Sequence, residues 1–66
     1  MAHLVDLRPG ALLVARKEKE AQMLPNARLC VYLREDDACG GILVLWPSGT
    51  VSGHYPADLD PWFEPA

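Results

Sequence analysis

Apolar and polar residues alternate most regularly in the middle of the chain, over residues 27–34. The apolar positions Ala27, Leu29, Val31 and Leu33 alternate with Arg28, Cys30, Tyr32 and Arg34. A period of two is typical of a β-strand, because successive side chains point to opposite faces of a sheet. The pattern predicts a strand over 27–34, with Leu29 and Val31 on the core face and a mixed opposite face.

A turn, a second strand and a hairpin are predicted after this strand. Residues 35–41 (EDDACGG) are charged and then glycine-rich, which is typical of a turn. Residues 42–46 (ILVLW) are apolar at every position and fit a central strand that is covered on both faces. Residues 47–49 (PSG) predict a tight turn, with the glycine at a positive φ, that leads into a strand over 50–55.

The C-terminal residues predict one helical turn and a short edge strand. Pro56 ends regular pairing, and Pro56-Ala57-Asp58-Leu59 fits one turn of 3₁₀ helix with Leu59 pointing inward. Residues 60–63 can then form a last short strand. Pro61 restricts this strand to an edge of the sheet, because proline lacks the N–H that a central strand needs.

Residues 11–24 (ALLVARKEKEAQML) contain many helix formers, yet their pattern argues against a helix. A helix in a small domain needs an apolar stripe along its whole length, and the charged run 16–20 interrupts that stripe. We therefore expect a short strand over 11–16, launched by a turn at 8–10 and followed by a polar loop that reaches Asn26.

This order of elements resembles the SH3-like small barrels, including their Tudor-like branch. The resemblance is carried by residues 41–59, with a strand ending at Trp46, a tight turn, a strand ending at Tyr55 and a helical turn. Looser similarity covers residues 11–63. It implies an all-β, five-stranded barrel with a long first loop and a 3₁₀ turn before the last strand. The chain would be one domain over residues 1–66, with tails at 1–9 and 64–66.

The resemblance also implies a shallow binding groove. Its aromatic residues would be Tyr32, Trp46, Tyr55 and Trp62, with Asp58 at the rim. Such rings can grip a proline-rich ligand or a cation. The alternative is that Trp46 and Tyr55 fill the core, which we favour for Tyr55, whereas Trp62 beside a proline fits an exposed contact. Four aromatic rings exceed the interior of so small a barrel, so one of them is expected to meet a partner or a second copy of the chain.

Charge is divided unevenly along the sequence, although the net charge is only −3. Residues 1–34 hold all six basic groups and three acids, whereas residues 35–66 hold six acids and no lysine or arginine. This split is compatible with an ordinary solvated surface or with an acidic face for a basic protein partner. Phosphate binding needs clustered cations and is disfavoured by the total.

No metal site, cofactor or catalytic residue is predicted. His3, Cys30, Cys39 and His54 match no paired metal-ligand spacing, and the two thiols are expected to be reduced, with a Cys30–Cys39 bridge as the alternative. Ser52 or Cys30 with His54 lacks an orienting acid.

Residues 51–56 (VSGHYP) with Leu59 are similar in outline to the last strands of type II dihydrofolate reductases. The glutamine–isoleucine pair that meets the ligands in that family is missing, so the activity is not carried over.

Three functions remain as expectations. The favoured function is a non-enzymatic protein-binding module, such as an adaptor, inhibitor or antirepressor-like regulator. The alternatives are a nucleic-acid-associated regulator and a small oligomeric enzyme. The regulator would use Arg8, Arg16, Lys17, Lys19, Arg28 and Arg34, of which Arg28 and Arg34 are expected on one strand face. No apolar run approaches the ~18 residues of a membrane span, and residues 1–6 lack signal-peptide features, so we expect no membrane partner and a cytoplasmic location.

Overall fold

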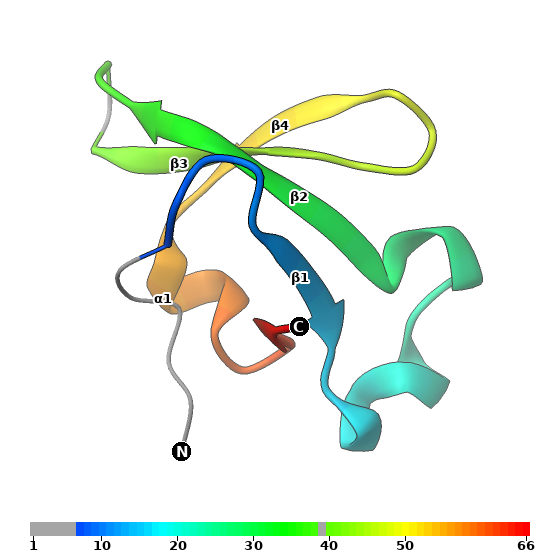
Figure 1. The fold of residues 1–66 in the computed structure, drawn as a ribbon. Helices are drawn as coiled ribbons and strands as arrows, with labels where there is room; N and C mark the ends of the chain where they lie inside the picture. Colours follow the sequence, from blue (N-terminus) through cyan, green and yellow to red (C-terminus); the bar gives the residue numbers. More distant parts are fainter. Residues whose placement is uncertain (1–6, 39) are drawn as a thin grey trace.

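A single antiparallel sheet of five strands forms the protein, as the computed structural model of the chain shows for residues 7–38 and 40–66 (Figure 1). The strands are β1 (Leu12–Ala15), β2 (Leu29–Asp36), β3 (Gly41–Leu45), β4 (Val51–His54) and β5 (Phe63–Pro65). Two 3₁₀ helices, η1 (Lys17–Gln22) and η2 (Pro25–Ala27), lie in the first loop, and the four-residue helix α1 (Pro56–Leu59) precedes β5. The mostly-β expectation is therefore confirmed.

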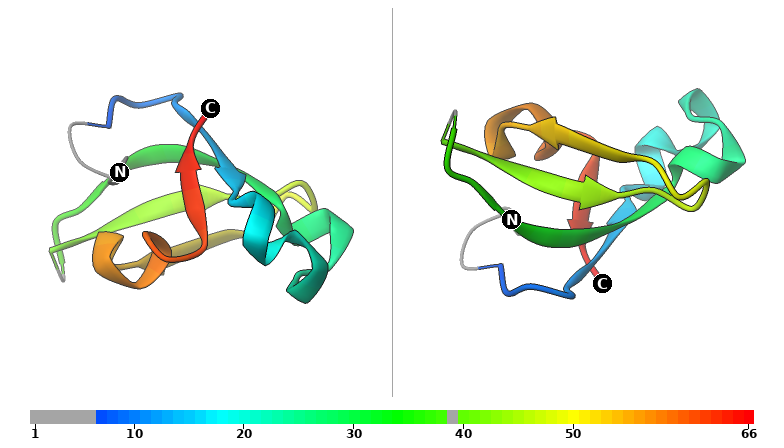
Figure 2. Two further views of the ribbon diagram at one scale, coloured as in Figure 1. Left: turned by 90° about the horizontal axis from the view of Figure 1, so that it is seen from below. Right: turned by 90° about the horizontal axis from the view of Figure 1, so that it is seen from above.

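Strand order in the sheet is β4-β3-β2-β1-β5. Strands β1 to β4 form a meander, and β5 returns to pair antiparallel with the other edge of β1. The two views of Figure 2 place α1 and β5 on one side of the β2–β3–β4 part of the sheet. Strands β4 and β5 end the order without pairing with each other, so the sheet is open and the expected closed barrel is not formed.

The predicted elements are found, with shifted boundaries. Residues 11–24 contain β1 and the short helix η1, so the strand that we expected in place of a long helix is confirmed. The last strand lies at Phe63–Pro65, later than expected, and it includes most of the predicted C-terminal tail. Of the predicted N-terminal tail, residues 1–6 lie outside the described residues.

Helix α1 and the β3–β4 turn follow the local sequence. α1 is a single turn of α-helix rather than a 3₁₀ turn, with Pro56 in its first turn and Leu59 buried as expected. Gly49 adopts φ +90°, and its N–H donates to the Trp46 carbonyl oxygen at 2.9 Å, which closes the turn. The positive φ explains the glycine, because side chains with a Cβ rarely adopt it.

The core contains eight buried residues: Leu13, Ala15, Cys30, Tyr32, Ile42, Val44, Leu59 and Phe63. In β2 it is therefore Cys30 and Tyr32 that face inward, whereas Leu29 is 38% exposed. The predicted assignment of the two faces of this strand is wrong. Every position from Leu29 to Leu33 is apolar or aromatic, so the alternation within β2 fixes no face. The neighbouring strands decide it, because Cys30 pairs with Leu13 and Tyr32 with Val44, both fully buried.

A β-bulge interrupts the pairing of β2 with β3. The register passes from Tyr32 opposite Val44 to Arg34 opposite Leu43, which leaves Leu33 as the extra residue. In a regular ladder Arg34 would stand opposite the buried Ile42. The bulge therefore turns Arg34 to the outer face beside Leu43, and the exposed Glu35 takes the position opposite Ile42.

Leu13→Ala tests the observed core. Leu13 is fully buried, so we expect its truncation to lower the free energy of unfolding by about 2–5 kcal/mol through lost burial and cavity formation. Leu24 is 71% exposed in the first loop, and Leu24→Ala should change that free energy by less than about 0.5 kcal/mol. Urea denaturation followed by circular dichroism measures both variants, and equal losses would contradict the core described above.

Candidate functional site

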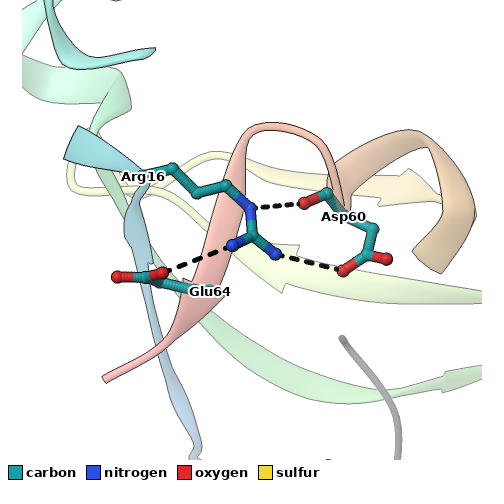
Figure 3. Close-up of polar contacts among 3 residues, drawn as sticks. All are labelled: Arg16, Asp60 and Glu64. Atoms are coloured by element: carbon teal, nitrogen blue, oxygen red, sulfur yellow. Dashed lines mark hydrogen bonds and ion pairs between the residues drawn. The ribbon is translucent and has the colours of Figure 1, made fainter. Parts of the chain in front are cut away.

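Arg16 joins the first loop to the segment between α1 and β5. It directly follows β1, and its side chain is only 11% exposed. Its Nε donates to the Asp60 carbonyl oxygen at 2.7 Å, Nη2 lies 3.5 Å from Asp60 Oδ1, and Nη1 lies 3.3 Å from Glu64 Oε2 (Figure 3). The Arg16 backbone N–H also donates to the Trp62 carbonyl oxygen at 2.8 Å. We call Arg16, Asp60 and Glu64 the Arg16 clasp.

The geometry of the clasp suits arginine rather than lysine. A guanidinium presents several N–H donors in one plane, so one side chain reaches a backbone carbonyl and two carboxylates from different positions. Asp60 and Glu64 keep partly exposed side chains, at 26% and 41%. The clasp therefore fixes these acids at the surface without neutralising the acidic character of the segment.

A cation–π contact lies next to the clasp. Lys19, on η1, places its Nζ 4.8 Å from the centre of the Trp62 ring. This distance is within the range in which an ammonium is attracted to the face of an indole. An open pocket of about 400 Å³ adjoins it, lined by Arg16, Glu18, Asp60 and Pro61. The arrangement is an aromatic face that already holds a cation, next to a pocket with two carboxylate side chains in its wall.

Trp46 belongs to a separate hydrogen-bonded chain. Its Nε1–H donates to Ser52 Oγ at 2.6 Å, and Ser52 Oγ lies 2.7 Å from His54 Nε2. An indole N–H can only donate, so Ser52 Oγ accepts from Trp46, while the donor in the Ser52–His54 hydrogen bond depends on the tautomer of His54. The Trp46 ring also makes edge contacts with the rings of His54 and Phe63, at 6.0 and 5.8 Å between centroids.

This chain positions Trp46 rather than activating a nucleophile. The Ser52 oxygen is engaged by an indole donor, and among the described hydrogen bonds none joins a carboxylate to His54 Nδ1. An orienting acid at that nitrogen is what a serine nucleophile requires. The Ser52–His54 pair, which share one face of β4, is thus accounted for by packing.

The five predicted site residues do not form one groove. Tyr32 is a core residue with 5% exposure, so its ring does not reach the surface. Tyr55 is 52% exposed, and the preference for the core at this position is wrong. Asp58 is exposed on α1, where its N–H donates to the Tyr55 carbonyl oxygen at 2.9 Å. Among the described ring contacts, none joins Trp46, Tyr55 and Trp62 to one another.

Sequence reasoning missed the residues of the Arg16 clasp, of the pocket beside it and of the cation–π contact. These are Arg16, Glu18, Lys19, Asp60 and Glu64, which come from segments more than 40 positions apart. A signal was present in the opposite charge balance of the two halves of the chain, with a basic run at 16–19 and acids at 58–64. Charge balance alone does not predict which residues pair, because it does not show which loop lies against which distant strand.

The basic residues of the nucleic-acid hypothesis are dispersed. Arg16 is held in the clasp, Arg28 Nε donates to the Met23 carbonyl oxygen, and Arg34 Nη1 donates to the Glu35 carbonyl oxygen. Two of these three guanidinium groups lie in partly buried contacts, which leaves them poorly placed for phosphates.

Other candidate chemistry is limited in the described part of the chain. Over residues 7–38 and 40–66, no three histidine, cysteine, aspartate or glutamate side chains are grouped to hold a metal ion, while His3 and Cys39 lie outside these ranges. Cys30 is a free, buried thiol. No helix in the described residues has the length and apolarity to cross a membrane.

Comparison with protein-family models, with curated proteins and with solved structures finds no match for this chain.

Arg16→Gln tests the clasp. We expect it to lower the free energy of unfolding by about 1–3 kcal/mol, because it removes charge-assisted hydrogen bonds from partly buried carboxylates. Arg16→Lys should recover less than half of this loss, because an ammonium cannot reach all three acceptors. Lys17→Gln, one position further on and exposed, is the matched control with little effect. Urea denaturation measures all three, and full recovery by lysine would contradict the planar geometry.

Burial of Cys30 predicts a loss of stability at high pH. Burial raises the pKa of the Cys30 thiol from its ordinary value of 9.0 to about 11. The folded state therefore disfavours the thiolate, and this contribution to stability is complete below pH 9 and is lost as the pH rises towards 11. Between these pH values the free energy of unfolding should fall by up to about 1.4 kcal/mol per pH unit. Denaturation of the wild type and Cys30→Ala at pH 8 and 10.5 measures it, and equal pH dependence in both proteins would exclude this origin.

Proposed function

We propose that this chain is a cytoplasmic, non-enzymatic protein-binding module that takes a basic segment of its partner at the surface formed by η1, α1 and β5. It would act as an adaptor, inhibitor or antirepressor-like regulator. We further propose that the module is SH3-like, with an open sheet. The strand order, the long first loop and the single helical turn before the last strand support this relationship.

The contact between Lys19 and Trp62 carries the proposal. An ammonium group at 4.8 Å from the ring centre indicates that this face of the indole is accessible to a cation in the folded protein. Lys19 comes from the same chain and extends from an exposed 3₁₀ helix with no buried residue. A lysine or arginine of a partner can replace it on the ring at little cost, because the displaced ammonium returns to water.

Carboxylates around Trp62 favour a basic partner over an acidic one. Glu18 and Asp60 line the neighbouring pocket, and Glu64 lies on β5 at the clasp. Asp58 and Tyr55 extend the same segment through α1, with the Tyr55 ring half exposed. Complementary charge at the rim mainly accelerates association, whereas the aromatic contact supplies most of the affinity.

Binding of a decapeptide of alternating lysine and arginine, with a glutamate decapeptide as control, tests this function. In heteronuclear NMR titrations, the basic peptide should shift the indole N–H resonance of Trp62 and leave that of Trp46 in place, because Trp46 Nε1 is engaged by Ser52. Trp62→Ala should weaken binding about tenfold, in line with a cation–π contact of about 1–2 kcal/mol, and Trp62→Phe should retain part of the affinity.

Lys19→Ala should have the opposite effect on the affinity for the basic peptide. Removing the intramolecular cation frees the Trp62 face and should tighten peptide binding several-fold, while Lys17→Ala, on the same helix, should not. If Trp62→Ala binds the basic peptide with unchanged affinity, as measured from the other shifted resonances, this surface is excluded as the binding site.

A further inference from the structure

A row of apolar side chains crosses the sheet on the face opposite the core. Pairing aligns Leu12 with Val31, Val31 with Leu45, and Leu45 with Val51, so one residue from each of four strands stands in line. We call these four residues the outer row. Leu12 is 41% exposed and Val51 49% exposed, at the two ends of the row. Three strand spacings of about 4.8 Å give the row a length of about 14 Å.

The neighbours of the outer row extend the apolar surface. Val14 and Leu29 pair with each other one step along the strands, and Leu29 is 38% exposed. Leu29, Val31 and Leu45 also line an open apolar pocket of about 300 Å³ that reaches Pro47 and Gly49. An antiparallel sheet that faces water normally carries polar side chains on that face. A contiguous apolar surface of this kind marks a contact with another molecule.

The order of side chains in the outer row is self-complementary. From β1 to β4 it runs leucine, valine, leucine, valine. A two-fold axis parallel to the strands, between β2 and β3, sets Leu12 of one copy against Val51 of the other and Val31 against Leu45. Every long side chain then meets a short one, as interdigitating layers require. We propose that the outer face binds a second copy of this chain in an isologous dimer.

Charged groups lie at one end of the outer face, beyond the outer row. Arg34 stands opposite Leu43, and Asp36 Oδ2 lies 3.5 Å from where a Cβ on Gly53 would be, which places both groups at one end of the outer face. The axis brings Arg34 of each copy over β3 of the other, beside the other copy's Arg34, so these charged groups lie at the end of the interface and outside the outer row. The outer row itself carries no charge.

Because the core is small, association with a second copy would add to the stability of the fold. Only eight hydrophobic side chains are buried in the described part of the chain, and Cys30 is a free thiol. Domains of this size commonly gain stability by association. The outer face lies on β1 to β4, whereas the proposed peptide surface lies on η1, α1 and β5, so the two contacts can be tested separately.

Analytical ultracentrifugation over ~1 μM to ~1 mM protein tests the dimer. We expect the wild type to pass from 7.3 kDa to twice that mass. Val51→Lys changes an exposed residue of an edge strand and should weaken dimerisation more than tenfold. Leu24→Lys alters a leucine that is 71% exposed away from the sheet and should leave it unchanged. A wild type that stays monomeric, or a Val51→Lys variant that dimerises normally, would overturn the proposal.

A compensation experiment tests the pairing itself. Val51→Leu places leucine against Leu12 of the other copy and should weaken the dimer several-fold, although it adds apolar surface. Adding Leu12→Val restores a long-against-short contact and should recover the dimer. Tighter association of Val51→Leu would overturn the proposed axis. Peptide binding at Trp62, measured in the same variants, should stay unchanged, so loss of the dimer and loss of the peptide site are distinguishable.

Discussion

Pairing of β5 with β1 is the constraint on which the rest of the structure depends. It sets Val14 opposite Glu64 and Ala15 opposite Phe63, so the segment that follows α1 is held along the edge of the first strand. Phe63 and Leu59 complete the core beneath Leu13 and Ala15. The same pairing brings Glu64 and Asp60 to Arg16, and Trp62 to Lys19. The core and the candidate site therefore have one common cause, and neither is formed by a segment that is local in sequence.

Both faces of the sheet carry apolar side chains because the apolar pattern is doubled in the central strands. Strand β3 is apolar at Ile42 and Val44 on the core side and at Leu43 and Leu45 on the other side. The inner pair is buried, whereas the outer pair remains partly exposed. A sheet that serves only to enclose one core has no need of the second apolar set. The bulge at Leu33 also affects the outer face, because it directs Arg34 towards that face, opposite Leu43.

Local sequence signals predicted most of the strands but not which residues meet. The turn at residues 47–49, the helical turn at Pro56 and the strand before Arg16 each depend on a few adjacent residues, and each was predicted. The face of β2 was reversed because its centre is apolar on both sides, and only β1 and β3 decide between them. For the site, aromatic content pointed to Tyr55, which is exposed although we favoured the core for it, and to Tyr32, which is buried. The clasp could not be predicted, because it links residues 44 and 48 positions apart.

The long return of β5 also has a consequence for the order of folding. Strands β2, β3 and β4 can pair as successive hairpins soon after each is synthesised, since their partners are adjacent along the chain. β1 gains its second neighbour only when residues 63–65 are available, about 50 positions later. Closing so large a loop costs entropy before Phe63 is buried, so this step should limit the folding rate. Until β5 pairs, one edge of β1 has no partner strand, and an unpaired edge of this kind favours aggregation.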